Sequence, residues 1–214
     1  MHLEIFSDTI CPWCYIGKRR LERALRDRPM PDLSIRWRAF QLNPGMPAGG
    51  MDRHQYMAAK FGSAERAGRL YDTVTRVGAE EGIRFSFDRI GRTPNTMKSH
   101  RLLALAGQHG IQSKTLDSLF AAYFTEGRDV GQSEVLLDIG LAIGLPRAEI
   151  EAALSEDSPI GTTLAEDFLA RRQGINGVPY FVFNGRFGLS GAQEPEALYH
   201  MFDLAREDDA LVRV

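Results

Sequence analysis

A pair of cysteines at the junction between a predicted strand and a predicted helix constrains this chain more than any other feature. The segment Cys11-Pro12-Trp13-Cys14 directly follows the apolar, β-rich residues 3–7 and opens a helical pattern that ends near Arg28. Pro12 suits the first helical position, where its missing N–H is not needed. Cys11 is therefore expected at or near the N-cap of this helix, with Cys14 in the first turn and more deeply buried.

The predicted position of Cys11 favours a reactive thiol. A side chain at the N-cap accepts hydrogen bonds from the free backbone N–H groups of the first turn, and the positive end of the helix dipole stabilises a negative charge there. Both effects favour the thiolate, which is the nucleophilic form of cysteine. We therefore expect Cys11 to attack a disulfide and Cys14 to resolve the mixed disulfide. Trp13 is either an aromatic lid over this pair or a packing residue.

Zinc binding and inert core packing are the alternative interpretations of the cysteine pair. The chain has 2 cysteines in all, whereas a structural zinc site needs about four ligands. The histidines show no paired ligand spacing; they are His2, His54, His100, His109 and His200. Free cysteines are common core residues, but two cysteines at this spacing, where a strand meets a helix, favour exchange chemistry. No metal site is expected.

Composition and charge argue against several classes of partner. Lysine and arginine total 26, aspartate and glutamate 28, and the formal net charge is −2. This balance provides no general attraction to nucleic acid or to anionic membranes. No apolar run approaches the roughly 18 residues of a membrane span, and residues 1–8 carry no signal-peptide pattern. We therefore expect a cytoplasmic protein, in which a close cysteine pair is more often reactive than structural.

Strand patterns lie near both ends of the chain, and helical patterns fill the middle. The Pro- and Gly-rich residues 43–51 mark a boundary, after which helices are predicted to start at Ser63, Asn95, Ser113, Ser133, Pro146 and Pro159. Strands are predicted over residues 3–7, 33–41, 178–183 and 186–190, with a hairpin turn at Asn184-Gly185 and a last helix over residues 194–206. The sequence thus predicts an α/β fold: residues 1–45 and 158–214 form a sheet domain, and residues 46–157 form a helical insertion.

Four segments carry a resemblance to a known family. They are residues 7–19 (SDTICPWCYIGKR), 38–44 (RAFQLNP), 177–182 (GVPYFV) and 190–193 (SGAQ). Together they resemble the DsbA-like oxidoreductases of the FrnE type, in the thioredoxin superfamily, and the stretch from Asn95 to Leu102 extends the resemblance into the insertion. The resemblance implies a thioredoxin fold interrupted by a helical domain, and the activity of a protein disulfide oxidoreductase or isomerase.

The resemblance also implies roles for the segment that precedes the third strand. It implies that Val178-Pro179 is a cis peptide facing the dithiol, and that the backbone of Val178 pairs with a bound substrate chain. From the residues alone, Pro179 is equally a proline at the start of a strand, which is an allowed position. Periplasmic relatives usually have a histidine within the dithiol, where this chain has Trp13, so their strongly oxidising potential is not carried over.

A glutathione-using branch of the superfamily provides the second hypothesis. The 2-hydroxychromene-2-carboxylate isomerases and kappa-class transferases share this architecture but typically have a serine in place of Cys11. Keeping both cysteines favours dithiol exchange with protein or small thiol substrates. In that branch, the region of Ser190 and Gln193 holds the γ-glutamyl end of glutathione; here these residues equally cap the last helix. Glutathione is thus a candidate co-substrate, and no tightly bound cofactor is expected.

Two residues of the insertion are further candidates for the site. His100 is either a proton carrier or substrate contact that approaches the dithiol, or a plain structural histidine. Asn95 is either a helix N-cap or a substrate contact. The basic side of the first helix is expected to be solvated. A third hypothesis, a redox-linked chaperone, uses apolar side chains of the insertion as a contact surface: Met46, Met51, Met57, Phe61, Phe120 and Phe124. Whether the chain is a monomer or a homodimer is left open.

Overall fold

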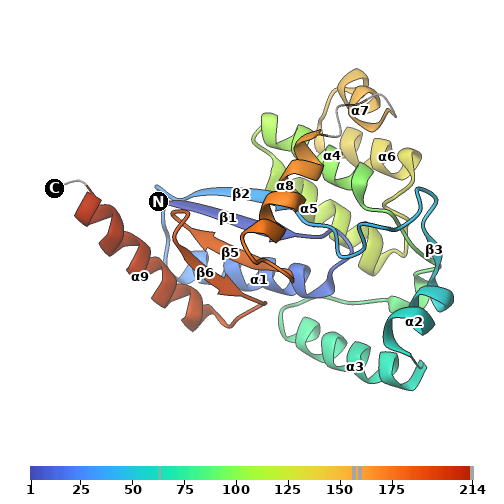
Figure 1. Cartoon of the computed structure of the whole chain (residues 1–214), viewed down its shortest axis with the longest axis horizontal. Coiled ribbons are helices and arrows are strands. Elements are labelled where there is room, and N and C mark those ends of the chain that lie inside the picture. The colour runs from blue at the N-terminus through green and yellow to red at the C-terminus, as the bar shows by residue number, and fades with distance from the viewer. Residues whose placement is uncertain (63, 156–157, 159–160, 213–214) are drawn as a thin grey trace.

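The two ends of the chain build one mixed sheet. The computed structural model describes residues 1–62, 64–155, 158 and 161–212. Its four-stranded sheet has the order β2-β1-β5-β6, where the strands are β1 (His2–Ser7), β2 (Ser34–Ala39), β5 (Tyr180–Phe183) and β6 (Phe187–Ser190). Strand β1 pairs in parallel with β2 and antiparallel with β5, so that Ile5 lies between Trp37 and Phe181 (Figure 1). The predicted pairing of the N-terminal and C-terminal strands is confirmed.

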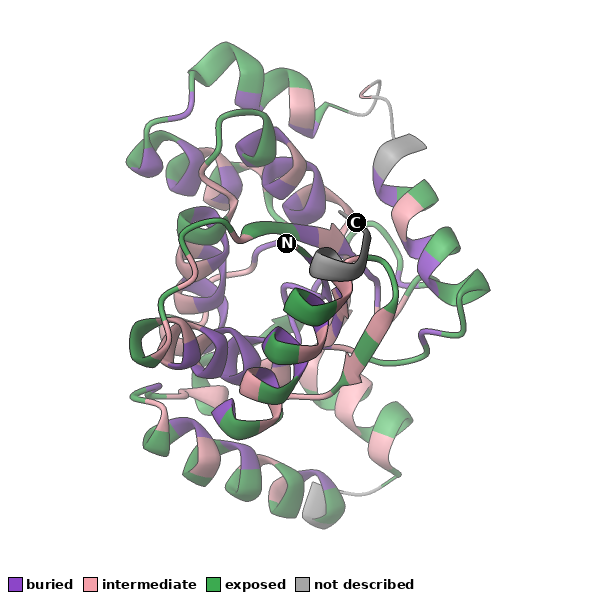
Figure 2. Ribbon diagram, turned by 90° about the vertical axis from the view of Figure 1, so that its left-hand side faces the viewer, coloured by how far each residue is buried: buried purple, intermediate pink, exposed green. Residues whose placement is uncertain are grey.

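Helices cover both faces of this sheet. Alternate residues of a strand point to opposite faces, and Leu3 and Ile5 belong to the core beneath α1 (Pro12–Asp27) and α9 (Pro195–Val212). Phe6 belongs to a smaller cluster with Phe40 and Ala170, beneath α8 (Gly161–Arg172). In Figure 2 the buried residues gather around the sheet, and the exposed ones form the outer faces of the helices. The sheet therefore has two cores, and the larger one supports the dithiol helix.

The segment between β2 and α8 is mostly helical, as predicted. Its helices are α2 (Arg53–Phe61), α3 (Ala64–Glu80), α4 (Met97–Gln108), α5 (Gln112–Phe120), α6 (Ser133–Ile143) and α7 (Arg147–Leu154), with the short helices η1 (Phe87–Arg89) and η2 (Ala121–Thr125). Helix α2 and the two-residue strands β3 (Met51–Asp52) and β4 (Arg92–Thr93) were not predicted. Two predicted helix starts, Ser63 and Pro159, and the predicted end of the insertion at residue 157 lie outside the described residues.

The insertion and the sheet domain share one hydrophobic core. Tyr15 of α1 stacks on Phe120 of α5 with ring centroids 4.9 Å apart, and it meets Phe85 edge-on at 6.0 Å. Phe120, Phe124 and Met46 are at most 8% exposed. These three residues therefore belong to the core rather than to the contact surface that the chaperone hypothesis requires.

The expectation that the basic side of the first helix is solvated is wrong for two of its residues. Lys18 is 1% exposed; its ammonium group pairs with Glu22 of the same helix and lies 2.7 Å from Asp117 of α5. Arg20 is also buried, and it lies 2.9 Å from Glu81. The prediction failed because helix periodicity identifies a charged side but not the acidic residues, distant in sequence, that cover it.

Among the described residues, we find no helix that is both long and apolar enough to cross a membrane.

Candidate active site

The dithiol lies where the sequence predicts, between the end of β1 and the first turn of α1. Cys11 is the N-cap residue, with φ −94° and ψ 112°, and Pro12 is the first helical residue. The amide of Cys14 donates to the carbonyl of Cys11 at 3.0 Å, which closes the first turn. Cys11 is 4% exposed and Cys14 is 0% exposed, and both are free thiols. The predicted order of burial is confirmed.

A cis peptide between Val178 and Pro179 faces the dithiol, as the resemblance implied. The Cys11 thiol donates to the carbonyl of Val178 at 3.5 Å across 167 residues of sequence. Gly17 allows the loop to approach this closely, because a Cβ atom at this position would lie only 3.0 Å from Cγ of Pro179. The segment that contains the cis proline is thus held directly against the first two turns of α1.

The Cys11 side chain makes no cap hydrogen bond. We expected its sulfur to accept hydrogen bonds from the free N–H groups of the first turn. A protonated thiol is a donor, however, and here it donates to the carbonyl of Val178. The Cys11 sulfur thus has a hydrogen-bond partner on the loop where a substrate chain is expected to lie, rather than in the first turn of α1.

The second thiol is shielded and held in its neutral form. Burial raises the pKa of Cys14 well above its ordinary value, and the nearby Cys11 raises it further. The Ser7 hydroxyl and the backbone N–H of Asp8 oppose this and lower the same pKa, but burial is the larger effect. Cys14 is therefore protonated at neutral pH and protected from solvent, which suits a resolving thiol that reacts with Cys11.

A buried carboxylate and a buried imidazole join the insertion to the dithiol loop. Asp8 is 0% exposed; one carboxylate oxygen accepts from the Leu42 amide at 2.7 Å, and the other lies 3.4 Å from Nε2 of His100. The carbonyl of Asp8 accepts from the Cys11 amide at 3.0 Å. His100 of α4 thus reaches the dithiol loop through Asp8. Sequence reasoning missed Asp8, although an acidic residue between a buried strand and a reactive pair was a visible signal.

Of the other predicted site residues, Asn95 lies at the start of α4, and Pro12 and Trp13 lie in the first turn of α1. Asn95 is not the N-cap of α4, which is Thr96, but lies one residue before it. Its side-chain oxygen accepts from the Met97 amide at 2.9 Å while its NH₂ group donates to the Met46 carbonyl at 2.6 Å, so it stabilises the start of the helix. Pro12 and Trp13 are half-buried beside the thiols. Pro12 and Trp13 adjoin Cys11 in the first turn of α1, and Val178 contacts its thiol.

The loop that contains Ser190 and Gln193 lies next to the cis proline. The Gly191 amide donates to the Pro179 carbonyl at 2.8 Å, and Arg20 holds the Ala192 carbonyl at 2.6 Å. Ser190 and Gln193 are exposed, and the Gln193 amide group donates to the Ser190 carbonyl at 2.8 Å. Their side chains are thus exposed on a loop that is bonded to the cis proline.

In the part of the chain that the structure describes, no group of three or more His, Cys, Asp or Glu side chains could hold a metal ion.

Comparison with known proteins agrees with this geometry. A family described as "DSBA-like thioredoxin domain" matches residues 2–203. A "probable DsbA oxidoreductase" from Streptomyces coelicolor is 31% identical and has a TM-score of 0.88, over 97% of this chain and 90% of that one. The resemblance inferred from the sequence and the thioredoxin-like fold are both confirmed.

Two more distant structures share the fold. A 2-hydroxychromene-2-carboxylate isomerase is 19% identical, with a TM-score of 0.74 over 99% of both chains. The cytosolic disulfide reductase DsbM of Pseudomonas aeruginosa, solved with glutathione, is 22% identical, with a TM-score of 0.64 over 100% of both chains. Fold alone therefore does not distinguish exchange from isomerase chemistry.

Because Cys14 is buried, the stability of the reduced protein should depend on pH. Burial raises the pKa of Cys14 in the folded state, whereas unfolding returns the thiol to water. Below the ordinary thiol pKa both states are protonated and the full stability is present. Above it the unfolded state loses its proton first, so stability falls as pH rises toward the folded-state pKa, by up to about 1.4 kcal/mol per pH unit.

Urea unfolding of the reduced protein across the alkaline range measures this effect. Cys14→Ala is the matched control and should lack this component of the slope. If the two proteins lose stability in parallel, the shielded thiol is not its source.

Proposed function

The chain belongs to the DSBA-like thioredoxin domain family, and we propose that it is a thiol–disulfide oxidoreductase that acts on protein or small thiol substrates through Cys11 and Cys14. The observation that carries this proposal is the contact of the Cys11 thiol with the carbonyl of Val178, beside a fully buried second thiol. One sulfur faces a loop that can hold a substrate chain, and the other is positioned to react with the first.

The proposed reaction uses two exchange steps. The Cys11 thiolate attacks one sulfur of a substrate disulfide; a Cys11–substrate disulfide forms, and the other substrate sulfur leaves as a thiolate and takes up a proton. Cys14 then loses its proton and attacks the Cys11 sulfur, which releases the second substrate thiol. The substrate gains two electrons and the enzyme keeps a Cys11–Cys14 disulfide. The reverse sequence oxidises a dithiol, and attack by a third substrate thiol gives isomerisation.

The surroundings of the dithiol support this division of roles. The backbone of Val178 is proposed to pair with the substrate chain, while Pro12 and Trp13 lie next to the Cys11 sulfur that attacks the substrate. A cytoplasmic setting is also proposed, which agrees with the similarity of the fold to the cytosolic disulfide reductase DsbM. In such a compartment the reductase direction is favoured, because the glutathione pool keeps most dithiols reduced.

Serine variants of the two cysteines test the proposed mechanism. Cys11→Ser should abolish exchange with a peptide disulfide, because no nucleophile remains next to the Val178 loop on which the substrate is proposed to lie. Cys14→Ser should still attack but accumulate a mixed disulfide, since the resolving sulfur is missing. Mass spectrometry of the quenched reaction detects the adduct, and a redox titration in glutathione buffers measures the wild-type two-electron transition. Normal turnover by Cys14→Ser would rule out the two-thiol mechanism.

His100 is proposed as a positioning residue that acts through Asp8. It lies against a carboxylate that is buried and adjoins the dithiol. His100→Leu leaves that carboxylate without this neighbour, which disfavours a nearby Cys11 thiolate and hence the reduced protein. The reduction potential should therefore fall, by roughly 10–30 mV for up to a tenfold change in the equilibrium constant.

His100→Gln is the matched variant, because its amide nitrogen lies near the position of Nε2 and keeps a polar group beside Asp8, so it should restore most of the potential. A merely structural histidine would change the unfolding midpoint in His100→Leu but leave the potential of the folded protein unchanged. That result would remove His100 from the site.

A glutathione-dependent isomerase or transferase is the second candidate function. It is favoured by the position of the Ser190–Gln193 loop, which is bonded to the cis proline through Gly191. If this function is correct, isothermal titration should show glutathione binding that weakens several-fold in Ser190→Ala and Gln193→Ala, and Cys14→Ser should retain activity. Absence of glutathione binding would eliminate this candidate, whereas dithiol exchange with peptides would survive.

A further inference from the structure

Strand β2 is an edge of the sheet, and side chains cover most of its outward backbone groups. Its outward residue Trp37 donates its amide to the side chain of Gln112 at 3.0 Å and accepts from the same side chain at 3.1 Å. The Ala39 amide donates to Glu166 at 2.9 Å. Gln112 from α5 and Glu166 from α8 thus take the place of a neighbouring strand, which is one way in which proteins protect an edge.

Ile35 is the exception along this edge. Strand residues alternate in direction, so Ile35 has the same outward orientation as Trp37 and Ala39. Its backbone N–H and C=O have no hydrogen-bond partner among the described residues, and its side chain is 36% exposed. One donor and one acceptor at strand spacing are therefore open to a chain that approaches from outside.

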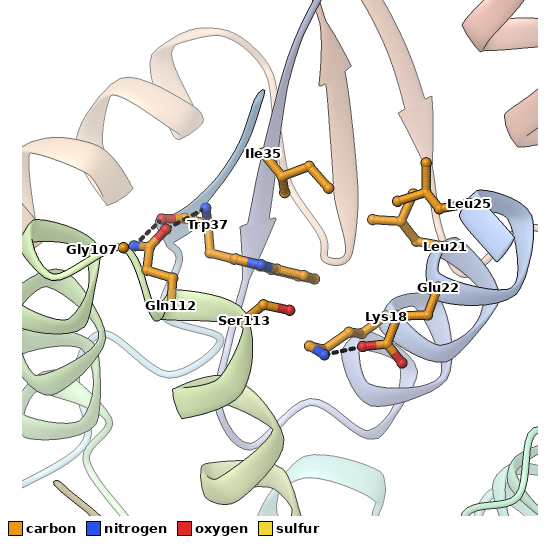
Figure 3. A pocket seen from close by; sticks show the side chains of 10 residues that line it. Lys18, Leu21, Glu22, Leu25, Ile35, Trp37, Gly107, Gln112 and Ser113 are labelled. Atoms are coloured by element: carbon orange, nitrogen blue, oxygen red, sulfur yellow. Dashed lines mark hydrogen bonds and ion pairs between the residues drawn. The ribbon is translucent and has the colours of Figure 1, made fainter. Parts of the chain in front are cut away.

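Clefts adjoin this position on both faces of the strand. On one face, a cleft of about 240 Å³ lies between α1 and the start of α5, and Figure 3 shows Trp37 and Ile35 on its strand side and Leu21 and Leu25 on its α1 side. Its lining is mostly apolar, and Ser113 borders it from α5. On the other face, a cleft of about 440 Å³ is lined by polar side chains that include Arg36 and Glu166.

Charge distinguishes the two faces further. The side chain of Arg36 is 57% exposed, and its nearest acidic partner is Glu166 at 3.5 Å. In the apolar cleft, the ammonium group of Lys18 is already neutralised by Glu22 and Asp117. An extended chain along the edge would therefore meet an apolar cleft on one face and, on the other, an exposed cation that shares Glu166 with Arg38.

We propose that this edge binds an extended polypeptide segment as an added strand. The backbone of the segment pairs with Ile35, one apolar side chain enters the cleft between Leu21, Leu25 and Trp37, and an acidic side chain of the opposite face lies near Arg36. Main-chain bonds and alternate side-chain pockets are the two components of recognition by strand addition. A small molecule would not pair with both backbone groups of Ile35 and also fill the clefts on the two faces of the strand.

This surface is separate from the dithiol. Ile35 pairs with Leu3 near the start of β1, whereas Ala39 pairs with Ser7 at the end that leads to Cys11. Ala39 lies four positions after Ile35, which is about 13 Å at strand rise. The segment would therefore dock a partner protein at a second site, without occupying the position where exchange is proposed.

Fluorescence anisotropy with a labelled, blocked peptide in which leucine alternates with glutamate tests the proposal. The wild type should bind it, and Ile35→Pro should weaken binding about fivefold or more, because the outward N–H is lost. Proline is tolerated there, since the missing N–H is outside the ladder with β1. Ile35→Val keeps the backbone donor and should bind as the wild type does. Arg36→Glu should weaken this peptide and favour one in which lysine replaces glutamate.

Dithiol exchange with a small disulfide serves as the folding control, since all three variants should retain it. Equal binding by Ile35→Pro and Ile35→Val, or no binding by the wild type, would overturn the proposal. Sedimentation that shows a dimer lost only in Ile35→Pro would also overturn it, in favour of a second copy of the chain at this edge.

Discussion

The antiparallel pairing of β1 with β5 is the constraint on which the candidate site depends. It joins residue 3 to residue 183 and residue 6 to residue 180, and so places the loop before β5 next to the loop after β1. Neither loop is reactive by itself: one carries two thiols, and the other a cis proline and a free carbonyl. Only this pairing brings Cys11 to within 3.5 Å of the Val178 carbonyl. The chemistry proposed here therefore requires the sheet to close before the site exists.

The helical insertion is part of the site rather than an addition to it. Its contacts with the dithiol helix and loop include three different kinds: Phe120 stacks on Tyr15, Asp117 neutralises Lys18, and His100 faces Asp8. Aromatic stacking buries apolar surface but fixes orientation only loosely. The two polar contacts are directional, and a buried charge that loses its partner is destabilising. The position of α1 is thus determined jointly by the sheet beneath it and by α4 and α5 beside it.

The parts of this arrangement that the sequence predicted are those with local signals. A proline after Cys11 indicates a helix start, and β-rich segments at both ends indicate one shared sheet. The burial of Lys18 and the contact of Asp8 with His100 were not predictable in the same way, because they depend on partners 99 and 92 residues away. Strands β3 and β4 have two residues each, which is too short to show the alternation of apolar and polar residues that predicts a strand. The cis peptide came from resemblance, because an X–Pro bond carries no local signal of its isomer.

The basic residues Lys18 and Arg20 of α1 are neutralised by ion pairs, so they contribute little to the reactivity proposed for Cys11. Lys18 and Arg20 lie within three turns of the dithiol, and their charges would favour a thiolate if they were free. Each is paired with carboxylates from the insertion or its own helix, so their fields largely cancel at a distance. Pro12 has no N–H and the Cys14 N–H is bonded to the Cys11 carbonyl. The groups left to stabilise a thiolate are therefore the Trp13 N–H and the dipole of α1. Reactivity at Cys11 would then follow from the Pro12 helix start, while the buried ion pairs hold the helix in place.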